Sequence, residues 1–121
     1  MVGLSSAGEA LVLTPLTGTC FVSLHTADPG DSGSSEVSGS AYARQSATFT
    51  NSGANPTVAA NNAIVTYPAA TGAWGTITHF GTWSASSGGT FRGSGALTTS
   101  KVVGSGDTAR FATGALTITA Q

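Results

Sequence analysis

The sequence contains very few charged residues, and this shortage excludes several classes of partner. Only 7% of its 121 residues are charged, against about 25% in ordinary soluble domains. The four basic and five acidic residues give a net charge of −1, so a basic surface for nucleic acid and a polybasic segment for anionic lipid are not expected. A surface of small neutral residues is typical of a protein packed in an assembly, or of an extracellular β-rich domain.

Cysteine and long apolar runs are also scarce. Because Cys20 is the single cysteine, an internal disulfide is excluded, and the protein fits synthesis in a reducing cytoplasm. No apolar run approaches the roughly 18 residues of a membrane span. Residues 11–16 are too short for a leader peptide and are interrupted by Pro15. A chain of 121 residues leaves no room for a second core, so one domain is expected.

The stretch of residues 74–85 contains both tryptophans and neither a proline nor a charged residue. Its β-branched and aromatic residues predict a long central strand. Alternation places Ile77 and Trp83 on one face and Trp74 and Phe80 on the other. With apolar side chains on both faces, this strand either lies in the middle of a sandwich or meets a partner with its outer face.

Shorter strands, separated by turns, are predicted along the rest of the chain. They are expected over residues 19–26, 42–50, 63–67, 90–92, 96–103, 108–112 and 115–119. About eight strands at this spacing indicate an all-β fold, an antiparallel β-sandwich of jelly-roll-like form built from residues 20–121. In the first strand, Cys20, Val22 and Leu24 share an apolar face. Loops are expected over residues 32–40 and 51–55.

Residues 1–19 are expected to form an N-terminal arm that contains a short helix. Ser6 and Glu9 have the spacing of a capping box, and the apolar residues that follow predict a helix over residues 6–13. The more ordinary role for this helix is to plug an open end of the sandwich. The alternative role is to dock on a neighbouring molecule.

No group of residues with the spacing of a catalytic or metal site is visible. His25 and His79 lie on different strands, and Cys20 faces away from His25, so the three ligands of a zinc site are not brought together. Asp28 and Asp31 flank a Pro-Gly turn, where aspartate normally bonds its own backbone; calcium binding is the less favoured alternative. We therefore expect no enzymatic activity, no cofactor and no metal.

Six blocks of the sequence stand out by their order and spacing. They are HTADPGD at residues 25–31, EVSG at 36–39, YARQ at 42–45, WGTITHFG at 74–81, GALTTSK at 95–101 and GDT at 106–108. In these blocks, which extend over about residues 20–119, the chain resembles a family of tailed-bacteriophage virion proteins. Its members are variously labelled minor capsid, head decoration or tail fibre proteins. The resemblance implies a small β-sandwich module of a phage particle without enzymatic activity.

The first functional expectation is a capsid decoration protein, of the cement or minor capsid type, that stabilises contacts between major capsid subunits on the outside of the head. Its partner is then the major capsid protein, and lattice symmetry favours a dimer or trimer of this chain. It is assembled in the bacterial host cytoplasm and resides on the capsid surface of the virion. No nucleic acid and no membrane partner are expected.

Two alternatives remain open. One is a tail fibre or tail-associated structural module that contacts the host surface. The other is a carbohydrate-binding β-sandwich, which requires Trp74 or Trp83 to be exposed; in a chain with so few large residues, the core is the more ordinary place for these rings. The interface candidates are Leu4, Leu11, Leu13, Tyr42, Arg44, Phe80 and Phe91.

Tyr42 and Arg44 share one face of their predicted strand. We predict that Arg44 forms a bidentate ion pair with Glu36 or Asp31, and that this pair holds the loop of residues 32–40 in place.

Overall fold

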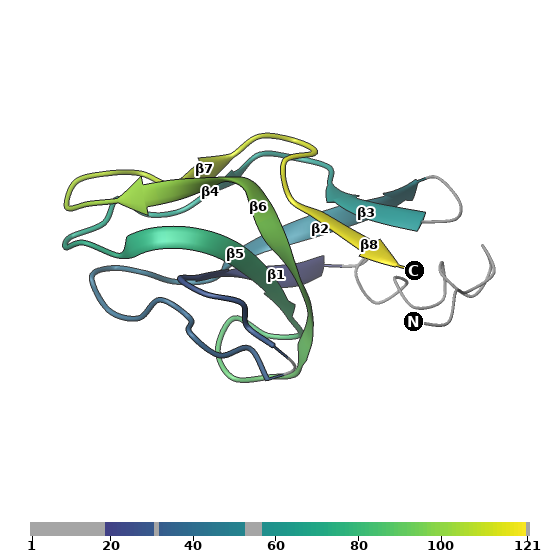
Figure 1. The fold of residues 1–121 in the computed structure, drawn as a ribbon, viewed down its shortest axis with the longest axis horizontal. Coiled ribbons are helices and arrows are strands. Elements are labelled where there is room, and N and C mark those ends of the chain that lie inside the picture. The colour runs from purple at the N-terminus through teal and green to yellow at the C-terminus, as the bar shows by residue number, and fades with distance from the viewer. Residues whose placement is uncertain (1–18, 31, 53–56, 121) are drawn as a thin grey trace.

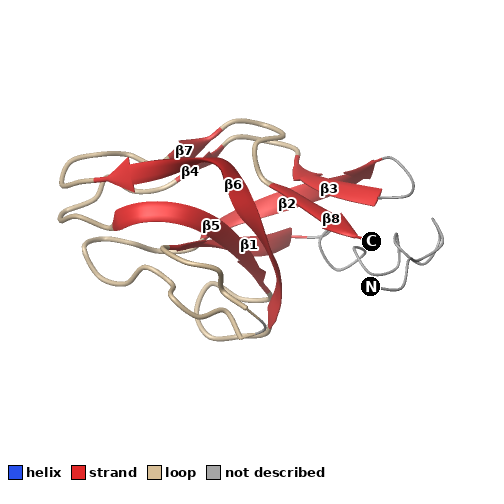
Figure 2. Ribbon diagram, viewed as in Figure 1, coloured by secondary structure: helices blue, strands red, loops and turns tan. Residues whose placement is uncertain are grey.

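The computed structural model describes residues 19–30, 32–52 and 57–120. Among these residues there are eight strands and no helix (Figure 2). The strands are β1 (Thr19–His25), β2 (Gln45–Ser52), β3 (Thr57–Asn61), β4 (Val65–Thr66), β5 (Gly75–Trp83), β6 (Phe91–Val103), β7 (Arg110–Phe111) and β8 (Thr117–Ala120). The described part of the chain contains no helix that could cross a bilayer. The predicted helix over residues 6–13 lies outside the described residues.

Six strands form one antiparallel sheet in the order β6-β5-β1-β2-β3-β8, and β4 pairs with β7 in a small second sheet (Figure 1). The large sheet curls until its two end strands approach each other. A Cβ atom placed on Gly95 of β6 would lie 2.5 Å from the carbonyl oxygen of Thr117 in β8. The result is a nearly closed barrel around one core, and the predicted all-β antiparallel fold is confirmed.

An irregularity in β5 changes the predicted orientation of its side chains. The pairing of β5 with β6 shifts register between Ile77 and His79. Ile77 pairs with Lys101 and His79 with Ala96, so two steps along β5 correspond to five steps along β6, and the regular ladder is interrupted there. Ile77 and Phe80 therefore both lie in the core, each with 0% exposure, whereas simple alternation placed them on opposite faces.

Three further differences from the predicted strands are seen in the structure. Residues 90–92 and 96–103 were expected as separate segments, but β6 is continuous over 13 residues, because Gly93 to Gly95 stay paired with β5. Strand β3 was missed, since its small residues lack the apolar alternation of a typical strand. Strand β2 begins at Gln45, three residues after the predicted start, because β1 pairs with β2 only as far as Val22 and bonds the loop after it from Leu24 onward.

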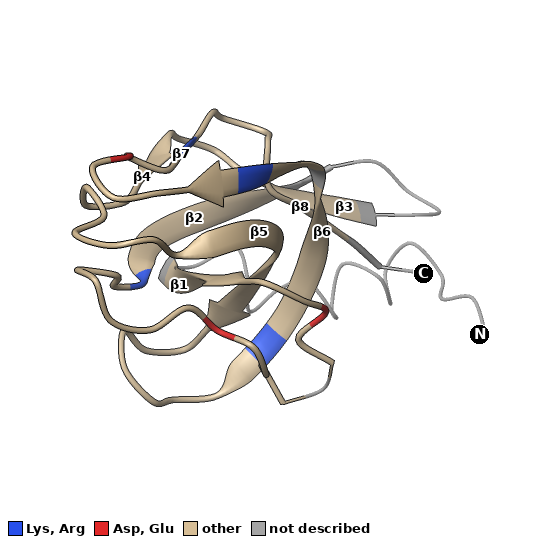
Figure 3. Cartoon of the chain, turned by 60° about the vertical axis from the view of Figure 1, so that its left-hand side comes forward, with Lys and Arg blue, Asp and Glu red and all other residues tan. Residues whose placement is uncertain are grey.

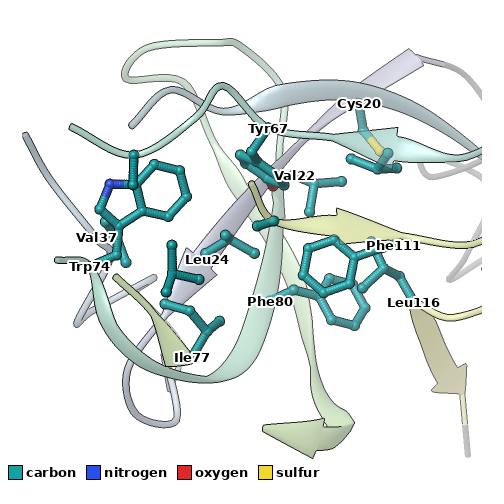
Figure 4. Packing of buried hydrophobic residues seen from close by; sticks show 14 of the residues in the cluster. Cys20, Val22, Leu24, Val37, Tyr67, Trp74, Ile77, Phe80, Phe111 and Leu116 are labelled. Atoms are coloured by element: carbon teal, nitrogen blue, oxygen red, sulfur yellow. The ribbon is translucent and has the colours of Figure 1, made fainter. Parts of the chain in front are cut away.

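The core lies inside the curled sheet (Figure 4). Cys20, Val22 and Leu24 of β1 are fully buried, as their alternation predicted. Tyr67 is also buried, and its hydroxyl donates a hydrogen bond to the carbonyl oxygen of Val22 at 2.6 Å. A buried tyrosine needs such an acceptor, so this contact satisfies the one polar atom of its side chain.

Candidate functional site

The second half of β1 is covered by the loop that follows it. Pairing with β2 ends at Val22, and beyond this point the backbone of the loop takes the place of β2. The amide of Val37 donates to the carbonyl of Leu24 at 2.9 Å, and the amide of Thr26 donates to the carbonyl of Ser35 at 3.2 Å. The loop therefore lies directly against the strand.

Beneath this loop, Ser23 and His25 occupy the face of β1 opposite to the apolar core. Both are 0% exposed. The indole nitrogen of Trp83 donates to Ser23 Oγ at 2.8 Å, Ser23 Oγ lies 2.6 Å from His25 Nε2, and His25 Nδ1 lies 2.7 Å from the carbonyl oxygen of Ser34. A continuous row of hydrogen bonds thus links β5, β1 and the loop.

Arg44 is the centre of a second set of contacts, which lies between the loop after β1, the turn between β5 and β6, and Trp83. Its Nε and Nη2 atoms donate to the two carboxylate oxygens of Glu36, each at 2.9 Å, so the predicted bidentate pair is confirmed, with Glu36 as the partner. Its Nη1 atom donates to the carbonyls of Ala85 at 3.1 Å and Gly88 at 2.8 Å. The guanidinium also lies 3.8 Å from the ring centroid of Trp83, in a cation–π contact.

Tyr42 completes this arrangement. Its hydroxyl donates to Glu36 Oε2 at 2.7 Å and accepts the amide of Leu24 at 3.0 Å. We name the connected residues the loop network; they are Ser23, His25, Ser34, Glu36, Tyr42, Arg44 and Trp83. This network joins the loop after β1 to the turn between β5 and β6 and holds both against the sheet.

Burial and hydrogen bonding shift the pKa values of the network in different directions. For Glu36, burial raises the pKa, but the hydrogen bonds from Arg44 and Tyr42 outweigh it and leave the pKa below its ordinary value. For Tyr42, burial and the hydrogen bond to Glu36 raise the pKa. The network therefore keeps Glu36 ionised and Tyr42 neutral at neutral pH.

Ser23 and His25 have the spacing of a nucleophile and its base, but their setting is not that of a catalytic pair. Neither side chain is exposed, and Ser23 Oγ already accepts the indole hydrogen of Trp83. Cys20 is equally unsuited to attack a substrate, because burial raises the pKa of its thiol to about 11, with Arg92 opposing the shift. Among the described residues, no three His, Cys, Asp or Glu side chains gather as metal ligands.

Asp28 has the local role that was expected of it. Its Oδ1 atom accepts the amide hydrogen of Gly30 at 2.9 Å within the turn. Asp31 lies outside the described residues.

An open hollow of about 340 Å³ lies above the loop network, between the loop and the β5–β6 turn. Glu36, Tyr42 and Arg44 line it together with the exposed residues Ser38, Ser86 and Ser87. The charges of Glu36 and Arg44 neutralise each other, so the hollow offers mainly hydroxyl and backbone groups to a partner.

The comparison with protein families decides the wider class. Residues 6–119 match the model of the family described as Podophage GP4 fiber I protein gp80. The chain belongs to this fibre family. No match was found among curated proteins.

Membership in the fibre family makes the chain a structural component of a phage virion, and the predicted relationship to tailed-phage virion proteins is confirmed. The family match agrees with the tail fibre alternative and gives no support to capsid decoration, which was the first expectation. The resemblance in the sequence blocks did not separate head from tail, because proteins with both labels share it.

The structure places the interface candidates of this fibre-family domain in different environments. Phe80 is fully buried in the domain's own core, so it has no exposed area for a partner, and this candidate is corrected. Phe91 is half-buried and packs on Trp83, with ring centroids 5.1 Å apart. Tyr42 and Arg44 belong to the loop network and border the hollow. Leu4, Leu11 and Leu13 lie outside the described residues.

The tryptophans do not form an exposed platform for sugars. Trp74 is 6% exposed, and its indole nitrogen donates to the carbonyl of Ser40 at 3.0 Å. Trp83 is half-buried between Arg44 and Phe91. Ser23, Ser34 and Trp83 were not predicted to belong to one network. The matching alternation of Ser23 and His25 was the local pattern that could have placed these two side chains together.

Proposed function

We propose that this chain is a non-enzymatic β-domain of a podophage tail fibre that acts by contact with the host surface. The observation that carries the proposal is the match of residues 6–119 to the fibre family, because it extends over every strand except the last residue of β8. We extend it to a homo-oligomeric fibre, since identical chains in an elongated appendage associate through repeated symmetric contacts.

The loop side of the barrel is the surface that we assign to contact. Arg44 holds the loop and the β5–β6 turn through contacts with Glu36, Ala85, Gly88 and Trp83. A surface that is already ordered loses less conformational freedom on binding, which favours affinity. Its shape is therefore available to a partner without prior rearrangement.

Few charges contribute to this surface. Figure 3 shows that Lys, Arg, Asp and Glu occupy only isolated positions along the described chain. Contact then depends on shape and on hydroxyl and backbone hydrogen bonds, and it depends only weakly on salt concentration.

The proposal of a non-enzymatic role is supported by the use of the reactive side chains in the fold. Cys20 and His25 are buried, Asp28 bonds its own turn, and Glu36 is shared between Arg44 and Tyr42. Each of these groups is buried or bonded within the fold, and none is positioned to face a substrate.

The location is tested by labelling purified virions with an antibody against this chain, and by measuring its copy number with quantitative mass spectrometry against the major capsid protein. We expect label on the fibres and a copy number far below that of the capsid protein. Label spread over the head, with a copy number comparable to the capsid protein or a simple fraction of it, would overturn the proposal in favour of capsid decoration.

The contact surface is tested by phage adsorption to the host. Ser87→Trp adds a bulky side chain at the hollow, and Thr113→Trp adds the same side chain at an exposed position between β7 and β8. We expect slower adsorption for the first variant and wild-type adsorption for the second. Equal adsorption by both variants would remove the hollow from the contact surface.

A further inference from the structure

The row of hydrogen bonds through His25 has a fixed direction. The indole of Trp83 only donates, and the carbonyl of Ser34 only accepts. Ser23 Oγ therefore accepts from Trp83 and gives its own hydrogen to His25 Nε2, and the hydrogen of the imidazole lies on Nδ1, where it is donated to Ser34. The neutral imidazole with this hydrogen position satisfies every partner in the row.

We propose that the loop network is an acid-sensitive latch, in which a second proton on His25 releases residues 32–36 of the loop from β1. The added proton would sit on Nε2 and point at the Ser23 hydroxyl, 2.6 Å away, whose hydrogen already occupies that space. The hydroxyl would then have to turn away, and a cation would be left at a position with 0% exposure. Opening the loop lets water reach the imidazolium.

The charged and titratable groups around His25 do not stabilise its cation enough to prevent the release of the loop. Glu36 on the loop favours the cation, but its two oxygens already accept hydrogen bonds from Arg44 and Tyr42. Arg44 and His79, the latter paired directly with His25 in the sheet, oppose it. With burial as the largest cause, the pKa of His25 is lowered although the Ser34 carbonyl and Glu36 act to raise it.

The direction of the pH effect follows from this shift. A histidine that is neutral in the closed state contributes its full stabilisation above the ordinary histidine pKa of about 6.5. That contribution is lost progressively as the pH falls below this value toward the lowered pKa of the closed state. Acid therefore favours the open loop.

The opening is local because few contacts hold the loop to β1. For residues 32–36 these are the backbone bond from Thr26 to Ser35 and the hydrogen bonds of the network. Ser34 and Ser35 are exposed, so little apolar area is uncovered when they move. Val37, which is 8% exposed and packs in the core, stays in place and bounds the segment that opens.

Hydrogen exchange on the full chain tests the latch. Exchange of the Thr26 amide, which donates to the Ser35 carbonyl, is measured by mass spectrometry between pH 7.5 and 5, after correction for the intrinsic pH dependence of exchange. For one linked proton, we expect the opening equilibrium to rise by up to about tenfold per pH unit below pH 6.5. Exchange in the core strands should not follow this dependence.

Two histidine variants provide the matched comparison. His25→Gln keeps a neutral hydrogen-bonding side chain and removes the titration, so the acid-induced opening should disappear. His79→Gln removes the neighbouring, half-buried histidine, which opposes the cation, but it leaves the Ser23–His25–Ser34 row intact, so the acid-induced opening should persist. The proposal is overturned if His25→Gln opens with the wild-type pH dependence.

A second measurement covers the case in which His25→Gln does not fold. The ring protons of His25 in the wild-type chain are followed by NMR over the same pH range, together with the amide of Thr26. Protonation of His25 and loss of the Thr26–Ser35 hydrogen bond should share one midpoint. Protonation while the Thr26 amide stays protected would overturn the latch.

Discussion

The two faces of β1 are equally buried but are held by different forces. Val22 and Leu24 face an apolar core, while Ser23 and His25 face the loop network, and all four are 0% exposed. Apolar burial is non-directional and tolerates modest repacking, whereas a buried hydrogen-bond row requires each partner at its place. The core side thus supplies most of the stability, and the network side determines where the loop lies.

The largest effect in this comparison is expected on the core side. Phe80→Ala should lower the free energy of unfolding by about 3–5 kcal/mol, because it removes a fully buried ring and leaves a cavity. Urea unfolding of the variant measures this loss. Val102, which is 74% exposed, provides the control, and Val102→Ala should change stability by less than about 0.5 kcal/mol. A loss below about 1 kcal/mol for Phe80→Ala would contradict the assignment of the core.

On the network side, Arg44→Ala should cost about 2 kcal/mol, since it leaves the carboxylate of Glu36 without its ion-pair partner in a largely covered site. Arg44→Lys keeps the charge and loses the bidentate geometry, so it should loosen the loop with a smaller loss of stability. Limited proteolysis within residues 32–40 measures loosening, and urea unfolding measures stability. Unchanged protease susceptibility in both variants would show that the pair does not hold the loop.

The closure of the barrel is tested by a substitution at its seam. A Cβ atom at Gly95 would lie 2.5 Å from the Thr117 carbonyl and 2.7 Å from the Phe80 ring, so Gly95→Ala should cost about 1–2 kcal/mol. At Gly93, in the same strand, the nearest atom would be 3.7 Å away, and Gly93→Ala is the matched control. Thermal unfolding compares the two, and equal melting temperatures would argue against close contact of β6 and β8.

The smallest effect is expected from the titration of Glu36. Because the folded-state pKa of Glu36 is lowered, its stabilising contribution is present above the ordinary glutamate pKa and is lost as the pH falls through the lowered value. Glu36→Gln should therefore reduce stability at pH 7 and narrow its difference from wild type at pH 3. Melting curves at the two pH values measure this, and a constant difference would refute the linkage.

Local patterns were sufficient to predict much of the fold. The alternation of β1, the turn at Asp28 and most strand positions followed from residue type and spacing. The Arg44–Glu36 pair was also predictable, because it needs only one strand and the loop beside it. Strand β3, the unbroken length of β6 and the shifted register between β5 and β6 were not predictable, since each depends on what lies across the sheet.

The all-β class, the apolar face of β1 and the scarcity of charge follow from composition and from neighbours two residues apart. The burial of Ser23 and His25 and the position of Trp83 over them depend on how distant strands pair. The Trp83–Ser23 hydrogen bond joins residues 60 positions apart, and no local pattern encodes a contact that exists only once β5 pairs with β1.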